Sequence, residues 1–198
     1  MPDFSPRLLR TFVQTISAEL GADNLSAVLE KAGLSLLLAD PAAVARFDAS
    51  AAAEAYAGLQ QAFRTYYGRG ARGILLRVGA QLWPRLLEES SLTVKPQIPL
   101  ARTLATAARP KPALELLARL LSAKSGDITV HTLDLDLLLV DHVSPSTHEQ
   151  RGTEPICWVT LGLMRESLFW AAAREYDITE TACRANGAGQ CEFHVKTG

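Results

Sequence analysis

The fold is decided by the stretch 155-PICWVTLGLMRESLFWAAAREYDITETACRANGAGQCEFHV-195, near the end of the 198-residue chain. Residues 155–173 are apolar on nearly every side, and a proline suits the first turn of a helix, so this part predicts a buried helix. From Tyr176 onward polar and apolar residues alternate up to the turn signal 186-NGAG-189 and alternate again over 191–195. This pattern predicts a β-hairpin that follows the helix.

All three cysteines of the chain lie in this stretch, at Cys157, Cys183 and Cys191. Cys183 closes the first predicted strand and Cys191 opens the second, so the turn brings both thiols to one end of the ladder, with Glu180 on the same arm. A contact from Cys157 would complete a Cys3Glu cage, and four protein ligands without an open position suit a structural zinc rather than a hydrolytic one. The alternative is that the cysteines are simply small buried hydrophobic residues, because the chain has no Cys-x-x-Cys.

The same positions resemble a known family, the 4-vinyl-reductase-type small-molecule-binding domain, whose fold is similar to that of TRAPP vesicle-tethering subunits. The family includes sensor domains of aromatic-hydrocarbon-responsive transcription regulators, a bacteriochlorophyll-biosynthesis protein and stand-alone hydrocarbon-binding proteins. In the sensor domains a structural zinc is held by residues that match Cys157, Glu180, Cys183 and Cys191, so the resemblance implies zinc here. The matching residues are Pro155-Ile156-Cys157, Gly162-Leu163, Glu180-Thr181-Ala182-Cys183, Gly187 and Cys191-Glu192-Phe193.

Composition excludes several classes of function. Hydrophobic residues make up 48% of the chain, and 20 Lys+Arg against 21 Asp+Glu give a net charge of −1, so no basic excess favours nucleic acid as a partner. Arg165 and Glu166 interrupt the most apolar run, and the N-terminus has no signal-peptide pattern, so we expect no membrane span and a cytoplasmic protein. An odd number of cysteines also argues against a secreted disulfide framework.

The first part of the chain predicts helices. Residues 5–20 follow the cap-and-proline pair Ser5-Pro6 and end at Gly21, a short helix capped by Asn24 ends at Gly33, and residues 50–67 form a long amphipathic helix. The segment 40–48 between them is predicted to be a loop or a short turn of helix.

The run 68-GRGARGILLRVG-79 contains a formal dinucleotide fingerprint, but a helix rather than a strand precedes it, so we reject that function. Its glycines are expected to turn one helix into the next and to let the second helix pack closely, with Arg72 and Arg77 anchoring its ends. The resemblance supports this interpretation, because stand-alone family members carry a similar run. The matching residues are Gly70, Arg72, Gly73, Arg77 and Gly79.

The second part predicts an extended connection over 92–100, helices at 100–108 and 113–122, strands at 128–132 and 135–143, and a polar loop at 148–153. The later strand of this pair is more continuously apolar and is expected to be central. The whole is α+β: an N-terminal helical region, 1–90, packed on a β-β-α-β-β antiparallel half, 91–198, which is the 4-vinyl-reductase-type ligand-binding domain. Many stand-alone members have Cys-Pro-x-Cys where this chain has 144-SPST-147.

No catalytic constellation stands out, since Gly-x-Ser-x-Gly, Walker and valid Rossmann motifs are missing. Aromatic residues gather where the last helix meets the sheet, and two histidines lie on neighbouring predicted strands. Such residues are usually core or surface, but some could line a pocket, with Arg77 or Glu166 as orienting polar groups. The candidate ligand-binding residues are Trp158, Phe169, Trp170, Tyr176, His131 and His142.

The function favoured by these patterns is a non-enzymatic sensor or carrier domain that binds a small hydrophobic or aromatic molecule. It would contain one structural zinc and form a homodimer through its amphipathic N-terminal helices. The alternatives are an enzyme or accessory factor in (bacterio)chlorophyll vinyl-group reduction, as the family name implies, and a protein-interaction scaffold. Because Cys157 begins the aromatic-rich helix, we also expect ligand occupancy to be coupled to the zinc hairpin.

Overall fold

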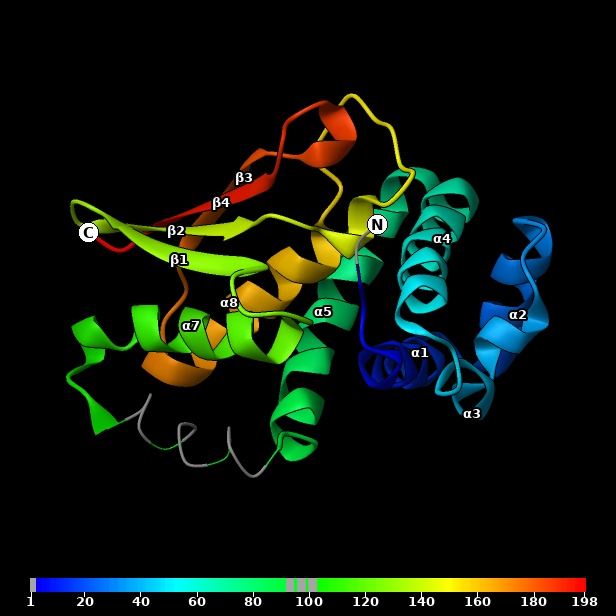
Figure 1. The fold of residues 1–198 in the computed structure, drawn as a ribbon, viewed down its shortest axis with the longest axis horizontal. Helices are drawn as coiled ribbons and strands as arrows, with labels where there is room; N and C mark the ends of the chain where they lie inside the picture. The colour runs from blue at the N-terminus through cyan, green and yellow to red at the C-terminus, as the bar shows by residue number, and fades with distance from the viewer. Residues whose placement is uncertain (1–2, 92–94, 96–98, 100–102) are drawn as a thin grey trace.

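The structure, a computed structural model, describes residues 3–91, 95, 99 and 103–198 (Figure 1). Its N-terminal half is helical, as predicted. The elements of this half are α1 (Pro6–Leu20), α2 (Ala22–Lys31), the 3-10 helix η1 (Leu36–Ala39), α3 (Pro41–Val44), α4 (Ala49–Tyr67), the 3-10 helix η2 (Gly68–Gly70) and α5 (Ala71–Glu88).

The ends of these helices follow local chemistry. Gly21 ends α1 with a φ of 84°, and Asp48 caps α4, where its side chain accepts a hydrogen bond from the Ala51 amide at 2.8 Å. The predicted cap at Asn24 is wrong, because α2 begins at Ala22 directly after the Gly21 turn. Asn24 therefore lies in the first turn of α2, and its side chain donates a hydrogen bond back to the Leu20 carbonyl at 2.7 Å.

The glycine run acts as predicted. Gly68–Gly70 forms the turn between α4 and α5, with a helix before it and a helix after it. A Cβ on Gly79 would lie 2.2 Å from the Val159 carbonyl oxygen, and a Cβ on Gly162 would lie 2.2 Å from the Leu76 carbonyl oxygen. The two glycines thus allow the backbones of α5 and the last helix to touch.

One predicted anchor of α5 is also present, whereas the other makes no anchoring contact with the described residues. The Arg77 guanidinium of α5 binds the Glu19 carboxylate of α1 at 2.7 Å. Arg72, the other predicted anchor, is exposed to solvent.

The C-terminal half has the predicted β-β-α-β-β order. Its sheet is antiparallel with the strand order β1-β2-β4-β3, so the second strand lies inside the sheet, as expected. The elements are the 3-10 helix η3 (Thr106–Ala108), α7 (Pro110–Leu121), β1 (Ile128–Leu133), β2 (Asp136–Asp141), the 3-10 helix η4 (Pro145–Thr147), α8 (Trp158–Ala172), β3 (Asp177–Ala182), the 3-10 helix η5 (Arg184–Asn186) and β4 (Cys191–Lys196).

Two predicted segments are only partly visible. The extended connection over 92–100 and the beginning of the 100–108 helix fall largely outside the described residues. Within the described part, residues 104–105 are not helical and the turn Thr106–Ala108 is a 3-10 helix, so the predicted helix is wrong for this portion.

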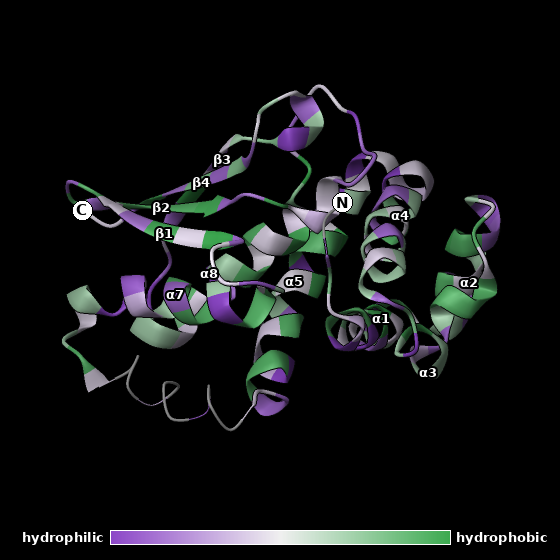
Figure 2. Cartoon of the chain, viewed as in Figure 1, coloured by the Kyte–Doolittle hydropathy of each residue, from purple (hydrophilic) through white to green (hydrophobic). Residues whose placement is uncertain are grey.

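The helices form layers under one face of the sheet. Figure 1 shows α7 and α8 beneath the strands and α5 on the far side of α8, with α1 and α4 beside them. Figure 2 shows that α5 and α8 are hydrophobic along most of their length, whereas η5 and much of the segment above the sheet are hydrophilic. The largest fully buried side chains include Phe12 and Phe63 of the N-terminal helices, Trp83 of α5 and Phe193 of β4.

Both halves contribute to this core, so the boundary near residue 90 stays a prediction rather than a visible gap. No helix in the described part of the chain combines the length and the apolar character needed to cross a bilayer.

Candidate functional site

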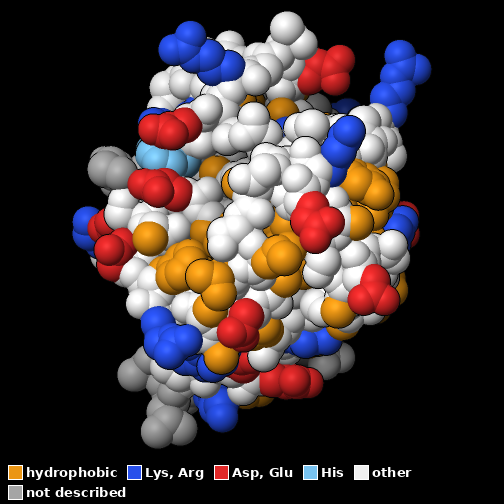
Figure 3. Space-filling view, turned by 90° about the vertical axis from the view of Figure 1, so that its right-hand side faces the viewer, with side chains coloured by type: hydrophobic (Ala, Val, Ile, Leu, Met, Phe, Trp, Pro, Cys, Tyr) orange, Lys and Arg blue, Asp and Glu red, His pale blue; other side chains and the backbone are white. Residues whose placement is uncertain are grey.

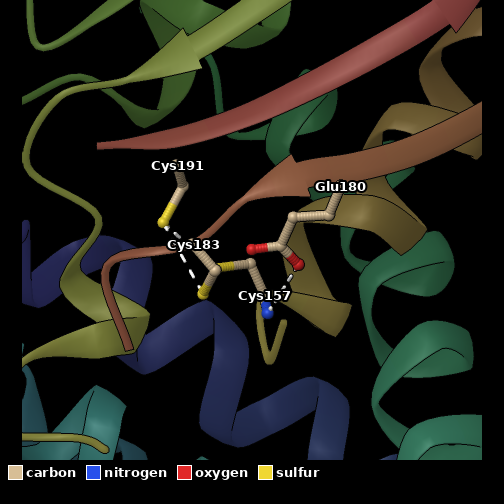
Figure 4. A group of neighbouring side chains, drawn as sticks. All are labelled: Cys157, Glu180, Cys183 and Cys191. Carbon is tan, nitrogen blue, oxygen red and sulfur yellow. Dashed lines mark hydrogen bonds between the residues drawn. The ribbon is translucent and has the colours of Figure 1, made fainter. Parts of the chain in front are cut away.

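Three sulfur atoms and one carboxylate converge at the end of the sheet (Figure 4). Cys157 precedes α8, Glu180 lies in β3, Cys183 follows that strand and Cys191 begins β4. The Cys157–Cys191, Cys157–Cys183 and Cys183–Cys191 sulfur distances are 3.6, 3.9 and 4.0 Å. One ligand atom from each of the four residues lies within 4.8 Å of the others. The structure therefore brings together the four residues that the sequence singled out.

These distances fit a tetrahedral metal ion. A zinc–sulfur bond of about 2.3 Å places two sulfurs about 3.8 Å apart across a tetrahedral centre. A disulfide would need a sulfur–sulfur distance of about 2.05 Å, and all three thiols are free and buried. Glu180 Oε2 accepts a hydrogen bond from the Cys157 amide at 3.1 Å, whereas Oε1 is buried and has no hydrogen-bond partner within ordinary geometry among the described residues. The unpartnered oxygen and the sulfur spacing together show that the residues suit zinc.

The predicted start of the last helix is wrong by a few residues, and the reason lies at this site. Residues 153–157 are not helical, and α8 begins at Trp158 rather than Pro155. Cys157 has φ −80° and ψ 47°. Because its backbone is not helical, its amide is free to donate to Glu180 and its thiol turns toward the hairpin.

The hairpin turn and a neighbouring loop hold the cysteines in place. The Arg184 amide donates to Cys191 Sγ at 3.3 Å, and Gly187 closes the turn with a φ of 97°. On the other side Ser144 Oγ lies 3.5 Å from Cys157 Sγ. The Ser144 amide donates in turn to the buried Asp141 carboxylate at 2.6 Å. Sequence reasoning noted 144-SPST-147 only as a departure from the family, and it missed Asp141 altogether.

Burial and hydrogen bonding set the charge of the cluster. Hydrogen bonds to the two other thiols, together with burial, raise the pKa of Cys157 well above its usual value. Those same two thiols donate hydrogen bonds to Cys183 and lower its pKa. Burial raises the pKa of Glu180 to about 8. Negative charge is thus concentrated on one sulfur, and binding of a divalent cation would release the remaining protons.

One cation near the cluster comes from the N-terminal half. Arg64 of α4 is largely buried, and one of its nitrogens, Nη2, donates to the Gln150 side chain at 2.7 Å. Burial lowers the pKa of Arg64, and the charges of Cys157 and Cys183 oppose that shift. Sequence reasoning missed this residue, because nothing in the local pattern of α4 distinguishes it from a surface arginine.

The predicted ligand-binding aromatic residues separate into two places. Phe169, whose exposed fraction is 49%, and Tyr176 line one surface recess of about 410 Å³, together with Arg165, Glu166 and Glu175.

Trp170 instead packs edge-to-face on the buried Trp83, with 5.6 Å between the ring centres. Trp158 is half-buried against the core. Neither tryptophan is among the residues that line the recess.

The two predicted histidines lie together but away from that recess. Thr129 Oγ1 lies 2.9 Å from His131 Nε2 and 3.1 Å from His142 Nε2, and both histidines are exposed. His131 also lines an open groove of about 640 Å³ between β1 and the end of α7. The predicted ligand set therefore does not form a single pocket.

Comparison with known proteins supports the resemblance over part of the chain. Residues 144–197 match the family model of the 4-vinyl-reductase domain. None of the curated proteins matches the chain.

The fold has counterparts among solved structures. An H-NOX protein from S. oneidensis in the Fe(II)NO ligation state has a TM-score of 0.59 and 15% identity, over 99% of this chain and 98% of that one. A second H-NOX structure, concerned with heme distortion, has a TM-score of 0.54 and 14% identity, over 96% and 92%. The phenol-responsive sensory domain of the transcription activator PoxR with phenol has a TM-score of 0.52 and 14% identity, over 73% of each chain. At this identity the likeness concerns the fold, which is α+β, and similarity to TRAPP subunits stays a prediction.

Proposed function

We propose that this chain is a non-enzymatic sensor or carrier domain that binds a small hydrophobic or aromatic molecule and holds one structural zinc ion. The observation that carries the proposal is the set of three sulfurs at tetrahedral spacing beside an unpartnered Glu180 oxygen, within a stretch that matches the 4-vinyl-reductase domain. The PoxR domain, which shares the fold, is a phenol-responsive sensory domain.

Zinc would act here as a cross-link. The ligands Cys157, Glu180, Cys183 and Cys191 fill a tetrahedral shell, so no position remains for a reacting water. What the ion supplies is a rigid connection between the start of α8 and the β3–β4 hairpin. The chain's own residues already approach that arrangement, because the Cys157 amide binds Glu180 and the Arg184 amide binds Cys191.

The recess at the far end of α8 is the proposed ligand site. Phe169 and Tyr176 offer aromatic surface, while Arg165, Glu166 and Glu175 offer polar groups that could orient a ligand. Its volume of about 410 Å³ lies within the range of about 300 to 1,000 Å³ that is usual for small-molecule sites. The Tyr176 hydroxyl is buried and has no hydrogen-bond partner among the described residues, so a ligand with a polar group could satisfy it.

A tetrapyrrole ligand is the main competitor, because it underlies the vinyl-reduction alternative and because the H-NOX comparison concerns heme distortion. The donors available in this chain do not favour an iron porphyrin. None of the four histidines is buried in the core between the helices and the sheet: His131 and His142 are exposed, and His148 and His194 are partly exposed. The vinyl-reduction and scaffold alternatives are therefore outcomes of the test below rather than second proposals.

The homodimer stays a prediction, as does the cytoplasmic location. The apolar faces of α1 and α4 that suggested a dimer are already buried within the single chain, including Phe12, Ile16 and Phe63. On the face that carries α2 and α4, hydrophobic side chains stand in separate groups between charged ones (Figure 3). Light scattering at micromolar concentration measures the oligomeric state directly.

Two measurements test the proposal. Metal analysis of the purified protein should give one zinc per chain, and Cys183→Ala should lose it. Calorimetric titration with phenol, and separately with indole, should show binding that Phe169→Ala weakens about tenfold, because one aromatic wall of the recess is removed.

The matched control is Tyr66→Ala, which removes an aromatic side chain of similar exposure, 44%, from a residue that does not line the recess. Equal effects of the two substitutions, or no binding of either compound, would contradict the ligand site. A metal-free protein with unchanged folding would contradict the zinc. A hemin titration that gives a stoichiometric absorption band would favour the tetrapyrrole instead.

A further inference from the structure

The two edges of the sheet differ in how they are protected. β1 and β3 are the outer strands. β3 has a register shift between Glu180 and Ala182 and carries Asp177, which pairs with Lys196 at 3.2 Å, and such irregularities and charges discourage pairing with another strand. β1, 128-ITVHTL-133, has no proline, no Asp, Glu, Lys or Arg, and an unbroken register with β2. The edge at β1 therefore lacks these protective features.

The outward backbone groups of β1 follow from its pairing. The His142 amide donates to the Asp127 carbonyl at 2.9 Å, so these two residues form a hydrogen-bonded pair of the antiparallel ladder. Hydrogen-bonded pairs alternate along such a ladder, so Thr129 and His131 bond to β2, whereas the amides and carbonyls of 128, 130 and 132 point away from it. In the described part of the chain these outward groups make no backbone hydrogen bond.

An open groove runs beside this edge. Its volume is about 640 Å³, and its lining includes four consecutive residues of β1, 128–131, on one side and the last turns of α7 on the other. In Figure 1, β1 lies at the edge of the sheet directly above α7. A fifth strand would lie about 4.8 Å from β1, on the side where this groove opens.

The helix side of the groove is mainly basic. Arg119 and Lys124 belong to the lining, with Glu115 as its acidic residue in the described part. Lys111, one turn before Glu115 on α7, reaches Thr132 of β1, where its Nζ donates to Oγ1 at 3.3 Å. Beyond the strand, Leu133 and Leu135 expose 45% and 79% of their surface. The edge thus combines unpaired backbone groups, positive charge and an apolar end.

We propose that β1 accepts an acidic, extended segment of a partner protein as an additional strand. Backbone hydrogen bonds to residues 128, 130 and 132 would hold the segment, its carboxylates would face Lys111 and Arg119, and an apolar side chain would cover Leu133. A second copy of this chain fits less well, because pairing of β1 with its own copy would bring the basic residues of two α7 helices together.

Two fluorescent peptides of equal length test this inference, one alternating Val with Glu and one alternating Val with Lys. Fluorescence anisotropy should show that the Glu peptide binds at least about tenfold more tightly than the Lys peptide and that added salt weakens it. Hydrogen exchange should slow at the amides of Ile128, Val130 and Thr132 when the Glu peptide binds. The amides of Thr129 and His131 should change little, because β2 already protects them.

Val130→Pro removes one outward amide and is compatible with an edge strand, so it should weaken binding of the Glu peptide at least about tenfold. Lys111→Glu provides an independent variant that leaves the sheet intact, and it should reduce the preference for the Glu peptide. Arg72→Glu, at an exposed position on α5, is the charge control and should change nothing.

Failure of both peptides to bind, or equal binding by the two peptides, would overturn the inference. Unchanged binding by both the Val130 and Lys111 variants would do the same. A dimer that Val130→Pro dissociates would assign the edge to a second copy and also overturn the partner. None of these outcomes depends on zinc or on an aromatic ligand.

Discussion

Gly162→Ala perturbs the contact on which the position of α8 depends. Gly162 faces α5, and a Cβ added there would lie 2.2 Å from the Leu76 carbonyl oxygen and 3.1 Å from the Ala80 amide nitrogen. Ordinary contacts of a Cβ begin at 3.4 Å, so the difference from 2.2 Å is 1.2 Å. Both helices present backbone at this crossing, and neither can yield by turning a side chain. The helices must therefore separate by roughly that difference.

Overpacking of a well-packed core costs typically about 1 to 3 kcal/mol, and backbone contact at the crossing places this variant at the upper end. The better helix propensity of alanine returns up to about 1 kcal/mol. We expect a net loss of about 2 kcal/mol in the free energy of unfolding. For a domain of this size that corresponds to a decrease of about 4 to 8 °C in the melting temperature.

The variant should also bind zinc more weakly. Cys157 directly precedes α8, so a shift of the helix away from α5 moves the Cys157 sulfur relative to Cys183 and Cys191. Metal sites tolerate deviations of only about 0.2 Å from ideal ligand distances. Competition with a chromogenic chelator measures this affinity, and urea denaturation with and without bound zinc measures the stability.

Gly58→Ala is the matched control. Gly58 lies inside α4, and its added Cβ would meet only Leu34 Cδ1, at 4.0 Å. We expect this variant to be as stable as the wild-type protein or up to about 1 kcal/mol more stable. If Gly162→Ala and Gly58→Ala had the same stability and zinc affinity, the close crossing of α5 and α8 would not position the cysteines.

Three further predictions concern charge, metal and packing. Burial raises the pKa of Asp141 to about 6, above its ordinary value of 3.8, so the folded state holds a proton that the unfolded state releases; stability relative to Asp141→Asn should therefore fall by up to about 3 kcal/mol as pH rises from about 4 to about 6, measured by urea denaturation of both proteins. Cys183→Ala leaves an incomplete cage, and because a structural zinc can contribute on the order of 10 kcal/mol, circular dichroism should show partial unfolding together with loss of indole binding; normal folding and unchanged binding would exclude coupling between metal and ligand. Trp170→Ala removes the edge-to-face contact with Trp83, worth about 0.5 to 1.5 kcal/mol beyond lost burial, so thermal denaturation should show lower stability while zinc content stays the same.

Much of the fold could be predicted because the signals that set it are local. The apolar repeat of α1 lies between Pro6 and Gly21, and the alternation on either side of Gly187 specifies the hairpin without reference to the rest of the chain. The start of α8 could not be predicted, because the conformation of Cys157 depends on its contact with Glu180, a partner 23 residues away. The cap of α2 was misplaced for a smaller reason, since Gly21 both ends one helix and begins the next.

By itself the sequence determined the α+β class, the hairpin and the identity of the four residues that meet at its base, since residue type and spacing over a few turns decide these features. Only the tertiary structure decided that the predicted ligand residues separate, with Phe169 and Tyr176 in one recess and Trp170 against Trp83. It also decided that β1 remains an open edge. Which side chains share a cavity, and which strand lies outermost, depend on how α5, α8 and the sheet pack together, and that energy is summed over contacts between residues far apart in the chain.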